Sequence, residues 1–73
     1  MHSKIIIDEI CDICGLDRNL IRTEQYFNDL GISSFDIVRI IISLEDKFDV
    51  HLENTDFDLS KLQKVQDMIN AFS

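Results

Sequence analysis

Apolar residues recur at helical spacing in three stretches of this chain, and no stretch gives a persuasive strand signal. The first stretch predicts a helix from about Ser3 to Cys14, and the residue that follows, Gly15, is of the type that commonly ends a helix. Side chains three or four positions apart share one helix face, which defines the inward side of this element. That inward side is expected to carry Ile6, Ile10, Ile13 and Cys14.

The second stretch predicts a helix from about Ser34 to Phe48. Its main core stripe follows from the same spacing of three and four. The stripe is expected to consist of Val38, Ile41, Leu44 and Phe48, flanked by Phe35 and Ile40. Ile37 and Ile42 fall away from this stripe, so we expect both side chains to be exposed.

The rest of the chain completes a small bundle. A last helix is predicted from about Leu62 to Phe72, with inward side chains at Val65, Met68, Ile69 and Phe72, and a short helix is expected at about Thr55 to Leu59. The long connection over residues 16–33 should be packed down by its apolar anchors, which are Leu16, Leu20, Ile21, Tyr26, Phe27 and Leu30. The pattern predicts an all-α fold: one domain over residues 1–73, a four-helix bundle with three main helices and one short helix.

Length and charge limit the function. A 73-residue domain buries only about 60% of the surface of its unfolded chain, which leaves little room for an internal active site. The formal net charge of −7 disfavours nucleic acid and anionic membranes as partners and favours a basic protein. No apolar run approaches the ~18 residues of a membrane span, and the start of the chain does not read as a signal peptide. We therefore expect a cytoplasmic protein that works at its surface or through an attached group.

Three candidate sites have weak support. Cys11 and Cys14 form a Cys-x-x-Cys pair, but at the end of a helix, where the dipole does not activate a thiol, and no second pair completes a zinc set. We expect Cys14 in the core, Cys11 partly exposed and no metal. Residues 56–60 resemble the opening of a calcium loop, but Lys61 replaces the required glycine. A catalytic triad around His51 would need an oxyanion hole and a cleft that so small a bundle hardly supplies.

Two serines stand at the start of the second predicted helix, just after Gly31. Serine is among the best N-cap residues, so capping is the simple interpretation of Ser33 and Ser34. One serine is enough to cap, however, and the hydroxyl of Ser34 is then free to face solvent. It would lie at the positive end of the helix dipole, which favours an attached phosphodiester. From the residues alone, a cap and an attachment point both stay open for Ser34.

Two segments together carry a recognisable pattern: Asp29-Leu-Gly-Ile-Ser-Ser-Phe-Asp-Ile-Val38 and Leu44-Glu-Asp-Lys-Phe-Asp-Val50. In this pattern, and in the order of its helices, nearly the whole chain resembles the acyl carrier protein family. The resemblance implies a single carrier domain in which Ser34 bears 4′-phosphopantetheine, derived from coenzyme A, through a phosphodiester. Ser33 is an alternative attachment residue, although the Leu-Gly-x-x-Ser register favours Ser34. The thiol of the arm would hold an acyl or aminoacyl group as a thioester, so the protein would be a carrier and not an enzyme.

The resemblance also implies partners for a monomeric carrier. A phosphopantetheinyl transferase would attach the arm, a ligase or transferase would load it, and a downstream synthase or transferase would receive the cargo. The acidic second and third helices would supply the docking face, and its candidate residues on the second helix are Asp36, Ile37, Arg39, Ile42, Asp46 and Lys47. Because seven acids lie within residues 33–58, docking to a basic patch is expected to be fast, weak and salt-sensitive.

The chain departs from the family pattern beside Ser34. Ser33 stands where the family usually has aspartate, and Arg39 and Lys47 interrupt a helix that is mostly acidic in housekeeping fatty-acid carriers. These departures favour dedicated partners over the general fatty acid synthase. Phe35 and residues 55–58 are similar to D-alanyl and stand-alone peptidyl carriers, so aminoacyl cargo ranks equally with specialised acyl or polyketide cargo. The alternative function is a non-carrier helical module used only for docking.

Overall fold

The computed structural model describes residues 3–51 and 59–72 and contains three α-helices: α1 (Ser3–Cys14), α2 (Ser34–Phe48) and α3 (Val65–Ala71). Single 3-10 turns lie at Arg18–Leu20, Asn28–Leu30 and Leu59–Lys61. The described residues contain no β-strand, so the prediction of an all-α fold is confirmed. The short helix expected at about Thr55 to Leu59 falls mostly outside the described residues. No described helix is long and apolar enough to cross a membrane.

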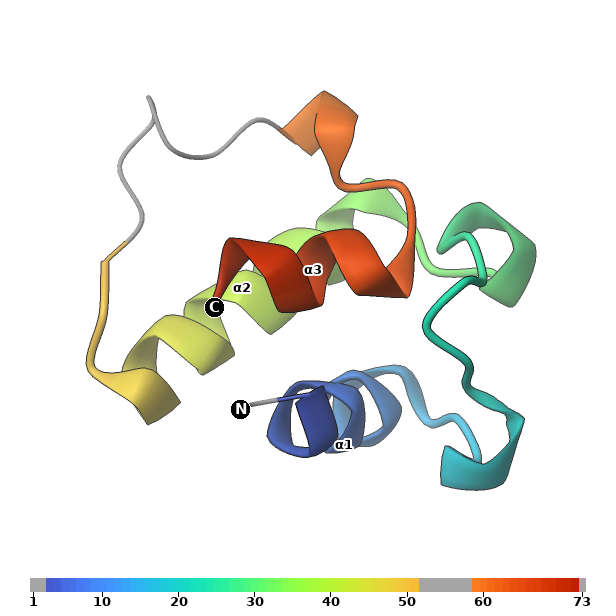
Figure 1. The fold of residues 1–73 in the computed structure, drawn as a ribbon, viewed down its shortest axis with the longest axis horizontal. Helices are drawn as coiled ribbons and strands as arrows, with labels where there is room; N and C mark the ends of the chain where they lie inside the picture. The colour runs from blue at the N-terminus through green and yellow to red at the C-terminus, as the bar shows by residue number, and fades with distance from the viewer. Residues whose placement is uncertain (1–2, 52–58, 73) are drawn as a thin grey trace.

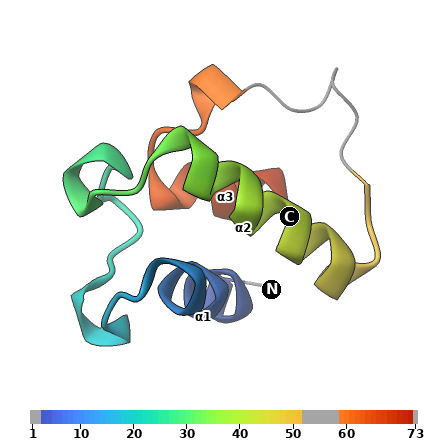
Figure 2. The ribbon, with the colours of Figure 1, turned by 180° about the vertical axis from the view of Figure 1, so that it is seen from behind.

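The core lies where α1 packs against both α2 and α3 (Figures 1 and 2). α1 has the predicted bounds. It ends at Gly15, whose backbone is left-handed with a φ of +67°. The Leu16 N–H donates to the carbonyl of Cys11 at 3.0 Å, which closes the helix end as glycine termini usually do.

The inward face of α1 differs from the predicted one. Ile6 and Ile10 are buried as expected. Ile7 and Cys11 are also buried, whereas Cys14 and Ile13 only pack partly against the core. The expectation for the two cysteines was therefore wrong: Cys11 lies in the core and Cys14 is the partly exposed thiol.

α2 also has its predicted bounds, and Ile40, Ile41 and Leu44 are buried as predicted, but the buried face is rotated towards Ile37. Its core residues are Ile37, Ile40, Ile41 and Leu44. Ile37 is only 6% exposed, so its expected exposure was wrong, whereas the exposure of Ile42 is confirmed. Phe35 and Val38, expected at or beside the core, are exposed instead.

α3 begins at Val65, three residues after the predicted start. The preceding residues instead run beside the connection between α1 and α2, where Phe27 donates its N–H to the Gln63 carbonyl at 2.8 Å. The carboxylate of Asp67 then accepts the N–H of Lys64 at 2.9 Å, which satisfies a donor at the helix start. All four predicted inward residues are buried, namely Val65, Met68, Ile69 and Phe72.

The connection over residues 16–33 is held down by fewer anchors than predicted. Ile21 and Phe27 are buried, and Leu16 and Leu30 pack partly against the core. The other two expected anchors, Leu20 and Tyr26, are exposed. Ile32, which was not among the predicted anchors, is buried directly before Ser33, and its N–H donates to the Phe27 carbonyl at 2.9 Å.

Candidate functional site

Ser33 caps the start of α2, as predicted. Its backbone is extended, with φ −81° and ψ 167°, and its Oγ accepts the N–H of Asp36 at 3.3 Å. The Asp36 carboxylate in turn accepts the Ser33 N–H at 3.4 Å and the Ser33 hydroxyl at 3.2 Å. This reciprocal pair is a capping box, with aspartate in the position usually held by glutamate or glutamine. The Ser33 hydroxyl is therefore engaged within the protein.

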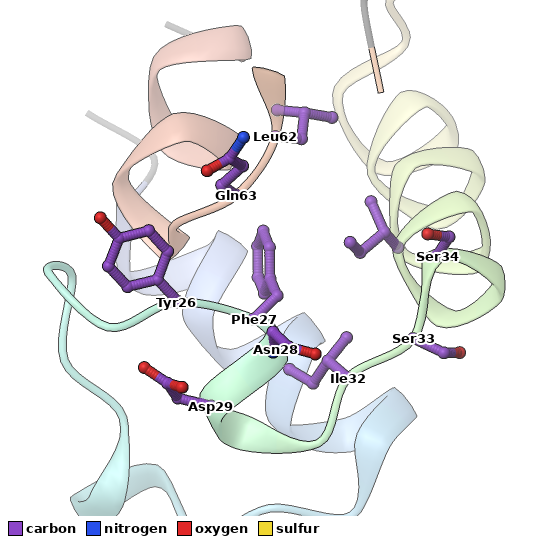
Figure 3. A pocket seen from close by; sticks show the side chains of 10 residues that line it. Tyr26, Phe27, Asn28, Asp29, Ile32, Ser33, Ser34, Leu62 and Gln63 are labelled. Carbon is purple, nitrogen blue, oxygen red and sulfur yellow. The ribbon is translucent and has the colours of Figure 1, made fainter. Parts of the chain in front are cut away.

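Ser34 is the first residue of α2 and is exposed. Within the described residues its hydroxyl has no hydrogen-bond partner. Figure 3 shows the two serine side chains pointing in different directions, with the Ser34 hydroxyl on the side of a hollow and the Ser33 hydroxyl turned away from it. Of the two adjacent hydroxyls, only the one on Ser33 is hydrogen-bonded within the described residues.

The hollow beside Ser34 has a volume of about 510 Å³. It lies between the start of α2, the 3-10 turn at Asn28–Leu30 and the segment before α3 (Figure 3). Its lining residues are Tyr26, Phe27, Asn28, Asp29, Ile32, Ser33, Ser34, Ile37, Leu62 and Gln63. Four apolar side chains among them are buried in the core, so the exposed lining residues are polar apart from the ring of Tyr26.

The start of α2 suits a negatively charged group on Ser34. The Ser33 cap accepts only the N–H of Asp36, so the N–H groups of Ser34 and Phe35 stay available at the positive end of the helix dipole. The Asp36 carboxylate would repel an anion, but the guanidinium of Arg39 lies 3.1 Å from it. This ion pair compensates the acid at the helix start.

The residues predicted for docking do not form one continuous acidic surface. Asp36 is occupied by Ser33 and Arg39. The ammonium of Lys47 lies 3.3 Å from the Glu9 carboxylate on α1. Asp46 and Ile42 are exposed, whereas Ile37 lines the floor of the hollow.

Sequence reasoning missed two exposed apolar residues on α2, Phe35 and Val38. They lie on the same side of the helix as Ile42, at spacings of three and four. A signal was present, because apolar residues occur all round this helix and cannot all be buried by two neighbouring helices. The spacing did not show which of them would face solvent.

The weaker candidate sites gain no support. Both cysteines are free thiols, and burial raises the pKa of Cys11 and of Cys14. The part of the chain that the structure describes holds no cluster of three or more metal-ligating side chains. The acids of the calcium-like segment, at 56 and 58, lie outside that part. His51 is exposed, and its Nδ1 lies 3.5 Å from the Glu45 carboxylate.

Comparison with known proteins agrees with this geometry. A family model described as "Phosphopantetheine attachment site" matches residues 4–72. The acyl carrier protein of Campylobacter lari is 32% identical over 68 residues, which cover 92% of this chain and 80% of the relative. The acyl carrier protein of Clostridium acetobutylicum is 41% identical over 64 residues, which cover 86% of this chain and 80% of the relative. That of Bdellovibrio bacteriovorus is 39% identical over 69 residues, which cover 93% of this chain and 85% of the relative. The chain therefore belongs to the phosphopantetheine-attachment family of acyl carrier proteins, and it is a carrier of covalently attached 4′-phosphopantetheine rather than an enzyme.

Proposed function

We propose that Ser34 is the attachment residue and that the protein presents acyl or aminoacyl groups to partner enzymes from the start of α2. One observation carries the choice of residue. Ser33 and Ser34 are adjacent and both exposed, but only the Ser33 hydroxyl is bound within the protein, by the capping box with Asp36. Modification of Ser33 would break that cap, whereas modification of Ser34 leaves it intact.

The surroundings of Ser34 support a phosphodiester at this position. The free N–H groups at the start of α2 and the helix dipole favour an anion, and Arg39 compensates the nearby Asp36 carboxylate. In the attachment reaction the Ser34 oxygen forms a bond to the pantetheine phosphorus of coenzyme A, and the pyrophosphate bond breaks. Adenosine 3′,5′-bisphosphate leaves, and the serine proton passes to a base of the transferase.

The bound arm supplies a terminal thiol, on which acyl groups are held as thioesters. The residues of this chain hold the base of the arm in a fixed place. α2 is anchored in the core through Ile40 and Leu44, both fully buried, and the capping box fixes its first turn. A partner enzyme therefore meets the arm at a defined position, while the arm itself remains free to reach an active site.

Three classes of partner follow from this function: a phosphopantetheinyl transferase, an enzyme that loads the cargo, and a synthase or transferase that receives it. We place their docking face on the exposed side of α2, with Arg39, Ile42, Asp46 and Lys47. Asp36 lies at its edge and is tied to the capping box. We leave Ile37 out of this face because its side chain is buried.

Specialised acyl or polyketide cargo and aminoacyl cargo remain equal candidates, ahead of primary fatty acid synthesis. The polar rim of the hollow beside Ser34 is compatible with both classes. We further propose that the carrier acts as a monomer in the cytoplasm. Two free thiols in a small chain fit such a reducing compartment.

Intact-protein mass spectrometry tests the proposal. The unmodified protein is incubated with coenzyme A and each of several phosphopantetheinyl transferases. We expect a mass gain of about 340 Da, the mass of the arm, in the wild type and in Ser33→Ala, and no gain in Ser34→Ala. A wild type that none of the transferases modifies would instead favour the docking-module alternative, and a gain that persists in Ser34→Ala would exclude this residue.

A further inference from the structure

The two thiols of α1 belong to no site described so far. Cys11 is buried in the core, at 8% exposure, whereas Cys14 packs only partly against the core. Cys14 is also the last residue of α1, and the chain leaves the helix at Gly15, whose φ is +67°. The thiol of Cys14 is therefore more open to a second sulfur atom than the thiol of Cys11.

Contacts between α1 and α2 show which end of α2 lies beside Cys14. Glu9, earlier on α1, accepts the hydroxyl of Ser43 in the second half of α2 at 2.6 Å. Burial raises the pKa of the Cys14 thiol, and two charges on the first turns of α2 act on this pKa as well: Asp36 raises it and Arg39 lowers it. Because the effect of a charge falls with distance, the end of α1 that carries Cys14 lies toward the start of α2.

The start of α2 is where the arm would bring a third thiol. Ser34 is the first residue of this helix, and the arm is a flexible chain that ends in a thiol. A short flexible link gives two groups an effective concentration on the order of millimolar, so the arm thiol meets Cys14 more often than it meets another carrier molecule in dilute solution. The arm thiol is not buried, so a larger fraction of it is ionised, and it should react with an external disulfide before Cys14 does.

We propose that Cys14 is a modification site for the protein's own arm: in the presence of a small disulfide, the arm thiol and the Cys14 thiol join in an intramolecular disulfide. The inference rests on the proposed attachment at Ser34. The arm thiolate first attacks one sulfur of the small disulfide, which gives a mixed disulfide and releases one small thiol. The Cys14 thiolate then attacks the arm sulfur, and the second small thiol leaves. The arm and Cys14 each lose one hydrogen, and the small disulfide is reduced to two thiols.

The closed disulfide stops the work of the carrier without loss of the arm. An arm sulfur that is bonded to Cys14 cannot hold a thioester, so the carrier cannot be loaded until a thiol reductant opens the ring. An arm that already holds cargo has no free thiol and cannot close. Cys11 takes no part, because side chains three apart on a helix keep their Cβ atoms about 5 to 6 Å apart, beyond the span of about 3.5 to 4.5 Å in a disulfide.

Mass spectrometry of the protein with its arm attached tests the inference. This holo protein is incubated, dilute and at about pH 8, where part of the thiols is ionised, with a small excess of glutathione disulfide. Closure removes two hydrogens, about 2 Da, whereas an arm that stops at the mixed disulfide gains about 305 Da. Trypsin without reductant locates the bond, because Cys14 lies on the peptide covering residues 5–18 and Ser34 on the peptide covering residues 23–39.

Two variants separate the thiols. Cys14→Ser removes the proposed acceptor at a partly exposed position, where serine is tolerated. Cys11→Ala is the matched control, because it removes the other thiol of the same helix and keeps an apolar side chain in the core. Circular dichroism checks that both variants remain folded. The protein without its arm, treated in the same way, reports any disulfide that forms between the two cysteines themselves.

We expect the linked peptide pair to be the main product in the wild type and in Cys11→Ala, at rates within about threefold of each other. In Cys14→Ser we expect at least about tenfold less linkage, with the glutathione adduct left on the arm. A wild type that accumulates this adduct as Cys14→Ser does, or a linkage that persists in Cys14→Ser, would overturn the inference. So would the loss of two hydrogens in the protein without its arm, or a dimer joined through two arms. A wild type that no transferase modifies would remove the proposed function and the inference with it.

Discussion

Ser33 and Ser34 are neighbours in the chain but differ in what their hydroxyls contact. The capping role of Ser33 follows from the sequence, because serine before an apolar-periodic run is a typical N-cap. The sequence also suggested a free hydroxyl on Ser34. It did not reveal that Asp36 completes the cap, or that Arg39 pairs with Asp36. Arg39 and Lys47, first interpreted as marks of particular partners, both have ion-pair partners inside the protein.

The cap gives a prediction for Ser33. Replacing Ser33 by alanine removes the acceptor for the Asp36 N–H, so we expect the free energy of unfolding to fall by about 1 kcal/mol. Ser33→Thr keeps a hydroxyl and should recover most of that loss. Urea denaturation followed by circular dichroism measures both. Equal stability of Ser33→Ala and the wild type would show that the capping box contributes nothing.

The two thiols give a second prediction at the residue scale. Burial raises the pKa of both Cys11 and Cys14, so alkylation by iodoacetamide at pH 8 should be slow, and the buried Cys11 should react after Cys14. In the unfolded chain the thiols ionise near pH 8.5. The folded state keeps its thiol protons to a higher pH than the unfolded chain does. The free energy of unfolding should therefore have its full value below the pKa of the unfolded thiols and decrease as the pH rises through the higher pKa of the folded thiols.

Peptide mapping of the alkylated protein and unfolding curves at several pH values check these expectations. The two thiols serve as controls for each other, because the order of their alkylation is read within one sample. Faster labelling of Cys11 than of Cys14 would contradict the burial seen at these positions.

At the scale of the elements, the bounds of α1 and α2 were predictable but their orientation was not. Apolar residues surround α2, so the spacing is compatible with more than one inward face. The position of the neighbouring helices selects the face with Ile37, Ile40 and Leu44. The late start of α3 has a similar cause, because pairing of the Gln25 carbonyl with the Val65 N–H at 3.0 Å holds the preceding residues outside the helix.

A polar contact between α1 and α2 gives a prediction at this scale. The Glu9 carboxylate accepts the Ser43 hydroxyl at 2.6 Å and lies 3.3 Å from the Lys47 ammonium, with only 13% of its side chain exposed. Because hydrogen bonds to partly buried charges are worth more than surface pairs, we expect Glu9→Ala to lower the free energy of unfolding by about 2 kcal/mol.

Asp12→Ala is the matched control, since Asp12 is an exposed acid on the same helix, and it should change stability by less than about 0.5 kcal/mol. A double-mutant cycle of Glu9→Ala with Ser43→Ala, measured by urea denaturation, isolates the coupling. Strict additivity of the two changes would show that this contact does not join the helices.

At the scale of the whole molecule, the connection over residues 16–33 is part of the structured domain. Phe27 is 1% exposed, and the segment around it forms backbone hydrogen bonds to residues before and within α3, including Gln66 N–H to Thr23 carbonyl at 2.9 Å. The sequence indicated that this connection packs down, but it could not show the long-range pairing with Gln63 and Val65. That pairing positions the end of the connection, and with it Ser34, against the bundle.

Two phenylalanines show the difference between the core and the exposed surface, because Phe27 is 1% exposed and Phe35 72%. Phe27→Ala leaves a cavity in the core, and a domain of this size has little other buried surface to stabilise it. We therefore expect the free energy of unfolding to fall by about 3 to 5 kcal/mol, which leaves the protein largely unfolded. Phe35→Ala removes an exposed ring and should change stability by less than about 1 kcal/mol. Thermal unfolding followed by circular dichroism compares them. Similar melting temperatures for both variants would contradict the assigned packing.

Attachment of the arm to Ser34 rather than to Ser33 can be measured directly. Trypsin cleaves after Arg22 and Arg39, so both serines lie on one peptide covering residues 23–39. Tandem mass spectrometry of this peptide, after treatment with coenzyme A and a phosphopantetheinyl transferase, locates the gain of about 340 Da by the fragments that break between the two serines. We predict that the added mass stays with the fragments that contain Ser34 without Ser33. Added mass on the fragments that end at Ser33 would contradict the claim.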